Sequence, residues 1–433
     1  MNIADWLAKP GLSKDEFAQL FELLLRAAGE SRPLQYDADS FLLVVLNADG
    51  TPGRDHTNLT NFYAEYQRVI DDTRDATDAA DADAEAAADV NSDARTLWAQ
   101  RTIAAMVERN SEVPDDYDDA MPNLRPRLWS RAGLAQVALQ LRLRGEPPEK
   151  SAMQVTGLPV GGHLLATVAY DLPHTVRSLP PAQLETWGVS LYVAIEAARE
   201  NLGTDAFECM QIGDGLFVVS TGDSWDASRI LLPQFISQLP LKGEPLAMVP
   251  ARDTLLLTGS DDVESQTIML ALAEERGHDP RPLLPTPLIW RDDLWHDWQP
   301  PPGHPHAAAI ERQMIGYLHG EYATQKDLLS QIHEQEGTDI FVASYSAMQS
   351  KDGDELFSYA VWSEGVVTLL PHTTRVAFMR PGEDGEGEMI GFAPFDRVRD
   401  VCGDLMLDTD MYPRRWFVNR FPADEQLAAI LGG

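Results

Sequence analysis

The chain has 433 residues, of which 44% are hydrophobic and 24% are charged, as in soluble globular proteins of two or three domains. Its 68 acidic residues outnumber its 34 lysines and arginines and leave a net charge of -34. Broad nucleic-acid binding needs a cationic face, and anionic membranes repel an acidic surface, so we expect neither partner. We attribute the acidic surface to solubility in preference to one specific cationic partner.

The amino terminus and the cysteines predict a cytoplasmic location. The first residues, MNIADWLAKPGLSKDEF, lack the basic segment and apolar core of a secretory signal. No apolar run approaches the roughly 20 residues that span a bilayer. Cys209 and Cys402 lie in different predicted domains, each within an apolar pattern. A reduced protein with two packed thiols is therefore expected.

Residues 1–150 form the first predicted domain, an α/β region. Its expected elements are a helix over 14–28 capped by Ser13, a strand over 41–46 and a helix over 59–69. The run from Asp71 to Asp93 is rich in Asp and Ala but has no apolar stripe, so we expect a solvated helix or a floppy insert rather than an interaction tail. A second acidic cluster lacks the ligand spacing of a calcium loop, which favours turn or helix-start carboxylates at Asp115, Asp116, Asp118 and Asp119.

Residues 151–299 form the second predicted domain, in which short apolar runs alternate with helical patterns. A buried strand over 164–169 precedes two helices, whose predicted N-caps are Ser178 and Ser190. Two hairpins are expected, because each pair of strands is joined by a short turn. The remaining predicted elements are strands over 207–212 and 216–220 joined by Gly213-Asp214-Gly215, a helix over 226–239, strands over 246–249 and 254–258, and a helix from Ser260 to Ala273.

A proline-rich linker, Gln299 to Pro305, precedes the third predicted domain at 306–433. That domain has a helix over 307–334, and its short connections favour antiparallel hairpins. Its expected strands cover 340–345, 356–362, 366–370 and 375–379, and a final helix covers 423–431. The predicted class is α+β (mixed α/β), with a two-lobed α/β amino-terminal region and an antiparallel α+β carboxy-terminal domain.

A set of moderately specific motifs carries a family resemblance. The motifs are YDLPHTVRSLPPAQLETWGVS, which begins at Tyr170, followed by EAARENL, DASRILLP, PARDTLLLTGSDD and MLALAEE. With them the chain resembles a bacterial family of uncharacterised proteins, domain of unknown function 1444, the YtpQ-like proteins. The resemblance runs from near Tyr36 to about Pro302, with 71–93 as an insertion and the part after Pro302 as an extension. It implies a bacterial protein and carries over no activity or catalytic residue.

Two groups of residues are candidates for chemistry. Asp171, Asp214, Asp223 and Asp253 lie at predicted strand ends or turns, where carboxylates of α/β enzymes gather, although aspartate is also a common turn residue. His296, His304 and His306 are candidate metal ligands. The prolines between these histidines restrict their geometry, so we favour a linker role for them. Gly213-Asp214-Gly215 lacks the third glycine of a dinucleotide fingerprint, and a hairpin turn explains it.

The sequence contains no recognisable active site, so the leading hypothesis is a non-catalytic protein-binding or adaptor protein whose partner is another protein. The alternative is a metal-dependent hydrolase, or another enzyme, that uses the strand-end carboxylates. No cofactor is predicted. Whether the chain is an enzyme and how many copies assemble are left open at this point.

Overall fold

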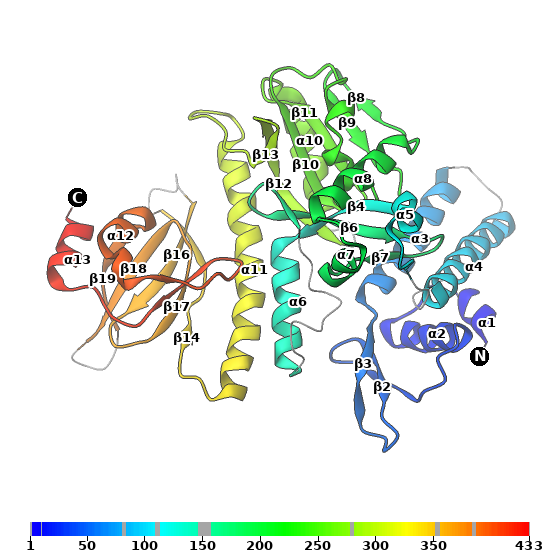
Figure 1. The fold of residues 1–433 in the computed structure, drawn as a ribbon, viewed down its shortest axis with the longest axis horizontal. Coiled ribbons are helices and arrows are strands. Elements are labelled where there is room, and N and C mark those ends of the chain that lie inside the picture. Colours follow the sequence, from blue (N-terminus) through cyan, green and yellow to red (C-terminus); the bar gives the residue numbers. More distant parts are fainter. Residues whose placement is uncertain are drawn as a thin grey trace. The chain divides into compact units, whose positions relative to one another are not determined.

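The structure, a computed structural model, describes residues 2–9, 11–79, 84–108, 113–145, 157–277, 281–350, 356–382 and 387–432 (Figure 1). Helices and mostly antiparallel sheets make it a mixed α+β protein, which confirms the predicted fold class. The chain divides into two compact units: unit 1 holds Met1–Arg125, Ala169–Arg177 and His278–Pro282, and unit 2 holds Pro126–Val168, Ser178–Gly277 and Leu283–Gly433. None of the described helices is long and apolar enough to cross a membrane.

Unit 1 combines helices with a small antiparallel sheet. Its elements are α1 (Ile3–Leu7), α2 (Lys14–Ala27), β1 (Leu34–Asp37), β2 (Leu42–Leu46), β3 (Pro52–Asn58), α3 (Thr60–Ala79), α4 (Ala84–Glu108), α5 (Tyr117–Ala120) and the short helix η1 (Met121–Asn123). Ser13 caps α2 as predicted, since the Glu16 amide donates to its hydroxyl at 3.3 Å and its own amide donates to the Glu16 carboxylate at 3.0 Å. The buried face of α2 belongs to the same core as Tyr66 of α3 and Trp98 of α4.

The two acidic stretches of unit 1 belong to helices where the structure describes them. The run from Asp71 to Asp93 forms the end of α3 and the start of α4, while residues 80–83 lie outside the described residues. Of the two alternatives for this run, the helix is therefore confirmed for its described part. Asp116 is the N-cap of α5 and accepts hydrogen bonds from the amides of Asp118 at 2.9 Å and Asp119 at 3.4 Å. The predicted helix-start role is confirmed for Asp116.

The central sheet of the described residues positions the candidate site. In spatial order its strands are β13 (Leu294–Asp297), β12 (Pro282–Arg291), β10 (Pro245–Ala251), β11 (Leu255–Gly259), β9 (Leu216–Val219) and β8 (Met210–Ile212). Both predicted hairpins are confirmed, with Ile212 opposite Leu216 and Leu246 opposite Thr258. Helix α10 (Val263–Arg276) packs on β10 and β11, and its Met269 is buried in their shared core.

Helix starts and stops in unit 2 follow local chemistry, with three corrections to the sequence analysis. Further elements that lie wholly or partly in unit 2 are β4 (Leu124–Ser130), β5 (Leu158–Val160), β6 (Leu164–Asp171), β7 (Val176–Ser178), α7 (Pro181–Trp187), α8 (Leu191–Thr204), η3 (Ala227–Leu231) and α9 (Pro233–Ile236). Ser190 caps α8 as predicted. Ser178 instead ends β7, and Pro180 precedes α7 as its N-cap.

The other two corrections concern the helices around the central sheet. The predicted helix 226–239 divides into η3 and α9 because Pro233 has no amide to donate to a continuing helix. Asp262, not Ser260, caps α10 and accepts from the Ser265 amide at 3.2 Å. The Ser260 hydroxyl is engaged elsewhere, because it accepts a hydrogen bond from the Glu244 amide at 2.9 Å.

The carboxy-terminal part contains two four-stranded sheets beside the long helix α11 (Ala307–Glu336), which packs against α6 (Arg131–Leu143) (Figure 1). One sheet has the order β14 (Phe341–Val342), β17 (Thr368–Pro371), β21 (Arg415–Val418) and β20 (Leu407–Asp408). The other has the order β15 (Ser346–Gln349), β16 (Leu356–Ser363), β18 (Arg375–Pro381) and β19 (Gly387–Pro394). The remaining elements are α12 (Phe395–Cys402), η4 (Gly403–Leu405) and α13 (Asp424–Leu431).

Two strand pairs of this part run parallel, where the sequence analysis expected antiparallel hairpins. The pairs are β14 with β17 and β16 with β18. The reason is that the chain alternates between the two sheets, so that β17 follows β16 in sequence but belongs to the other sheet. Short connections therefore join strands of different sheets here.

The division into three domains at 1–150, 151–299 and 306–433 stays a prediction, which limited proteolysis can test. Pro301 and Pro302 are exposed, so cleavage there should produce a carboxy-terminal fragment of about 130 residues on a denaturing gel. Because Ile310 of α11 is buried in the core of the central sheet, the two fragments should stay together during size-exclusion chromatography in native buffer. Resistance throughout residues 299–307 would contradict an accessible linker, and separation of the fragments would contradict the packing.

Candidate functional site

The four predicted aspartates have different surroundings. Asp171 ends β6, Asp214 is exposed in the turn between β8 and β9, and Asp253 is half-buried in the turn between β10 and β11. Asp223 is committed to an ion pair, in which its oxygen lies 2.5 Å from a nitrogen of Arg229. A carboxylate site shared among these aspartates stays the alternative hypothesis, and Asp223 is the member least available for it.

The ion pair of Asp223 is part of a buried network that the sequence analysis did not identify. Arg229 is fully buried and also pairs with Asp226, whose exposed fraction is 0%, at 3.0 Å. Asp226 accepts further hydrogen bonds from the Thr221 hydroxyl at 2.8 Å and the Gly222 amide at 2.9 Å. Burial alone would raise the pKa of Asp223, but the hydrogen bonds and charge of Arg229 lower it overall. The three-residue spacing between Asp226 and Arg229 was the available signal.

This network supports an exposed edge of the central sheet. The Arg229 guanidinium lies 4.4 Å from the ring of Phe207, which also packs edge-on against Phe235 at 5.0 Å. Phe207 thereby anchors the segment that leads into β8. Among the described residues β8 pairs only with β9, and its Met210 side chain is 61% exposed. The opposite edge strand, β13, is in contact with the β5–β6 turn, whose Gly161 amide donates to Trp295 at 3.1 Å.

A second cluster of polar side chains surrounds His163 in the β5–β6 turn. His163 Nδ1 is hydrogen-bonded to the Tyr412 hydroxyl, and its Nε2 lies 3.7 Å from an Asp297 oxygen. The Arg131 guanidinium lies 4.4 Å from the Tyr412 ring and donates to the Gly162 carbonyl at 2.9 Å. Because His163 and Tyr412 are 249 residues apart, no local spacing in the sequence could indicate them.

The electrostatics of this cluster favour a structural contact over an activated nucleophile. An imidazole between a carboxylate and a hydroxyl is the arrangement used to activate nucleophiles. Here, however, burial raises the pKa of Tyr412 far above its usual value, so its hydroxyl stays protonated. The cluster therefore joins the β5–β6 turn to the segment around Tyr412 through the His163–Tyr412 hydrogen bond and the contact of Arg131 with the Tyr412 ring.

We expect His163 to make stability depend on pH. Burial, the largest influence, and the charge of Arg131 lower the pKa of His163 below 6.5, while Asp297 opposes them. The unfolded imidazole therefore takes up its proton at a higher pH than the folded one, and stability falls as pH drops from about 7 to about 5. His163→Gln should reduce this fall, measured as the stability of β6 against amide exchange, and exposed His296→Gln should leave it intact. An equal fall in His163→Gln and wild type would contradict this assignment.

The three candidate histidines are only partly brought together. The rings of His304 and His306 lie 5.6 Å apart, and His306 Nε2 is 3.0 Å from the Thr267 hydroxyl. His296 is exposed on β13. Within the described part of the chain, no group of three or more His, Cys, Asp or Glu side chains could hold a metal ion. The adjacent pair alone supplies fewer ligands than the three or four of a protein zinc site.

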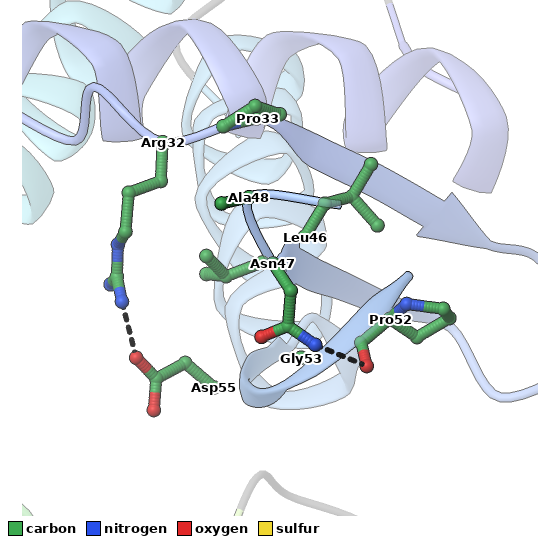
Figure 2. A pocket seen from close by; sticks show the side chains of 9 residues that line it. Arg32, Pro33, Leu46, Asn47, Ala48, Pro52, Gly53 and Asp55 are labelled. Carbon is green, nitrogen blue, oxygen red and sulfur yellow. Dashed lines mark hydrogen bonds and ion pairs between the residues drawn. The ribbon is translucent and has the colours of Figure 1, made fainter. Parts of the chain in front are cut away.

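Unit 1 also has an open hollow of about 740 Å³ beside β2 and β3. Figure 2 shows Arg32 turned toward Asp55 and the Asn47 amide turned toward Pro52. The Arg32–Asp55 pair is 2.5 Å long, Arg32 also pairs with Glu30 at 2.8 Å, and Asn47 donates to the Pro52 carbonyl at 3.3 Å. These polar groups bond to one another. A ligand in the hollow would therefore contact a mainly apolar wall, which supplies no specific recognition.

Comparison with known proteins gives a partial match. Over 99 residues the chain is 32% identical to the UPF0354 protein lin1649 of Listeria innocua, and the match covers 22% of this chain and 37% of that protein. The chain thus spans little more than a third of the length of the curated relative it matches. No family profile matches the chain, and no solved structure does. The chain therefore resembles an uncharacterised bacterial protein over part of its length.

Proposed function

We propose that this chain is a non-catalytic protein-binding protein, an adaptor in the bacterial cytoplasm that recognises another protein and belongs to the YtpQ-like family. One observation carries the proposal: β8 ends the central sheet with Met210 61% exposed at that edge. An unpaired sheet edge beside an accessible apolar side chain can accept a segment of another chain. The contact of Phe207 with Arg229 holds this edge in place before any partner arrives.

Affinity capture with two matched variants tests the proposal. Met210→Glu places a charge at the β8 edge, and Met389→Glu does the same on β19, where Met389 is 46% exposed. A native lysate should yield a protein that is retained by the wild type and by Met389→Glu but lost with Met210→Glu. A partner that Met210→Glu retains, or capture of no protein above background, would count against the proposal.

The alternative function is a metal-dependent hydrolase that uses the strand-end carboxylates. The ion pair between Asp223 and Arg229 argues against it, because a guanidinium already neutralises that carboxylate. Metal analysis after purification without chelator tests this alternative directly. A stoichiometric divalent metal that is lost in Asp171→Asn without unfolding would favour the enzyme.

A further inference from the structure

We propose that a second hollow of unit 1, between α2 and the β1–β2 hairpin, binds a lysine side chain of a partner protein. This α2 hollow has a volume of about 290 Å³. Its lining includes Ala18 and Leu43, which are 2% and 1% exposed and form an apolar floor. The inference goes beyond the β8 edge, because unit 1 alone forms this site.

The helical repeat of α2 produces one wall of the hollow. Asp15, Ala18, Gln19 and Glu22 are three or four positions apart, so they share one side of the helix. Ala18 is the smallest of the four, which leaves space above Leu43 of β2. An alkyl chain can therefore pack on the floor while its charged end reaches the polar residues of the wall.

Asp15 provides the negative charge for this recognition. It is exposed and forms no ion pair with any residue that the structure describes. Its Oδ1 accepts a hydrogen bond from the Tyr36 hydroxyl at 3.0 Å. Because a hydroxyl is neutral, this bond positions the carboxylate without cancelling its charge. Burial raises the pKa of Tyr36, and so does Asp15, which keeps the hydroxyl protonated at neutral pH.

The wall offers an ammonium group as many acceptors as it has donors. The acceptors are the carboxylates of Asp15 and Glu22 and the amide oxygen of Gln19, and a lysine ammonium has three N–H groups. Glu22 also pairs with Arg26 at 3.2 Å. Both side chains of that pair are partly exposed, and such surface pairs are weak, so Glu22 keeps the capacity to accept a second donor.

The charge around the α2 hollow selects a cation from another protein. Lys14 and Arg26 are the two cations of α2. Three carboxylates outnumber them, because Asp37 acts on Tyr36 together with the two carboxylates of the wall. A second copy of this chain carries a net charge of -34 and would be repelled, so the partner is a different protein.

The size of the hollow favours a side chain over a free small molecule. Sites that enclose small molecules have volumes of roughly 300–1,000 Å³, and this hollow lies just below that range. Asp15, Gln19 and Ala38 of its lining are exposed, so one side stays open to solvent. A lysine side chain fits this shape, because it enters with its alkyl chain and leaves its backbone outside.

Titration with a blocked lysine, N-acetyl-lysine-N-methylamide, tests the inference on the full chain. At constant ionic strength, the methyl NMR signals of Ala18 and Leu43 should shift in a saturable way at millimolar probe. Blocked norleucine, which has the alkyl chain without the charge, should leave them unshifted. Asp15→Asn keeps an oxygen for the Tyr36 hydroxyl but removes the charge, so it should weaken binding about tenfold. Asp39→Asn removes an exposed charge of the neighbouring turn and should leave binding unchanged.

Several results would overturn the inference. They are absence of a shift at about 50 mM probe, equal binding of blocked norleucine or blocked arginine, unchanged binding in Asp15→Asn, and equal weakening in Asp39→Asn. Binding of butylamine without binding of blocked lysine would mean that the hollow takes free amines, which refutes a partner side chain. Failure here leaves the proposed protein-binding function standing, because the capture experiment tests that function at Met210.

Discussion

Replacing Arg415 with alanine should lower the free energy of unfolding by about 4 kcal/mol. Arg415 is fully buried at the start of β21, and burial lowers its pKa to about 10, so the side chain is still charged at neutral pH. Its guanidinium donates to Gln325 Oε1 at 2.7 Å and to the Ala343 carbonyl at 2.8 Å. It also donates to the Leu369 carbonyl at 3.1 Å. One side chain thus joins α11 to β17 and to the end of β14.

The size of this effect follows from the groups left behind. A buried acceptor that loses its donor costs about 1–3 kcal/mol, and truncating a large core side chain adds a cavity. Removing the arginine also removes the free-energy cost of burying its charge, which offsets part of this loss. Because a chain of this size need not unfold in one step, amide exchange in β17 and β21 is the suitable measurement.

The neighbouring residue provides a matched control. Arg414 is about half exposed and pairs with Asp408 at the surface, an interaction that contributes about 0–1 kcal/mol. Arg414→Ala should therefore leave exchange in β17 and β21 nearly unchanged. Equal stability of Arg415→Ala and Arg414→Ala would contradict this prediction. It would mean that the free energy of the Arg415 hydrogen bonds only balances the cost of burying its charge.

Features that depend on a few consecutive residues could be predicted from the sequence. The Ser13 and Ser190 caps and the turn at Gly213-Asp214-Gly215 are of this kind, because each is determined by hydrogen bonds or backbone angles within a few positions. Pro233 was an equally local signal of the break between η3 and α9, and the prediction of one helix over 226–239 did not use it. Asp262 caps α10 in place of the predicted Ser260, because the Ser260 hydroxyl accepts a hydrogen bond from the Glu244 amide. The sequence does not reveal this long-range bond.

Features that depend on strand order or on distant contacts could not be predicted. The parallel pairing of β16 with β18 arises because β17, which lies between them in sequence, belongs to the other sheet. No local sequence pattern indicates that β17 belongs to the other sheet. The exposed β8 edge is likewise a property of sheet order. Buried arginines such as Arg415 are also not apparent in the sequence, because arginine is usually exposed.

Replacing Arg229 with methionine should lower the free energy of unfolding by about 3–5 kcal/mol, because it leaves a buried charge without its partner. Methionine keeps much of the apolar volume beside Phe207, so the change tests the charge more than the packing. Asp226, which is 0% exposed, would then keep only its bonds from Thr221 and Gly222. Amide exchange in β10 and β11, which contact η3, is the measurement.

A double-mutant cycle separates the charge from other effects of this change. Asp226→Asn in the Arg229→Met background should recover part of the loss, because it removes the unpaired carboxylate. Arg291→Met is the control, since Arg291 is half exposed and pairs with Glu244 at the surface, and it should change little. No recovery in the double variant would show that packing, not charge, dominates at Arg229.

The loss in Arg229→Met should also depend on pH. The pKa of Asp223 in the folded protein is below its ordinary value of 3.8, so the stability that it contributes is present above about pH 4 and is lost as pH falls through the folded pKa. The difference in stability between wild type and Arg229→Met, measured by amide exchange in β10 and β11, should therefore be larger at pH 7 than at pH 3. A difference that is constant across this range would mean that the charges of Asp223 and Asp226 contribute nothing through Arg229, and that packing of the Arg229 side chain against Phe207 dominates.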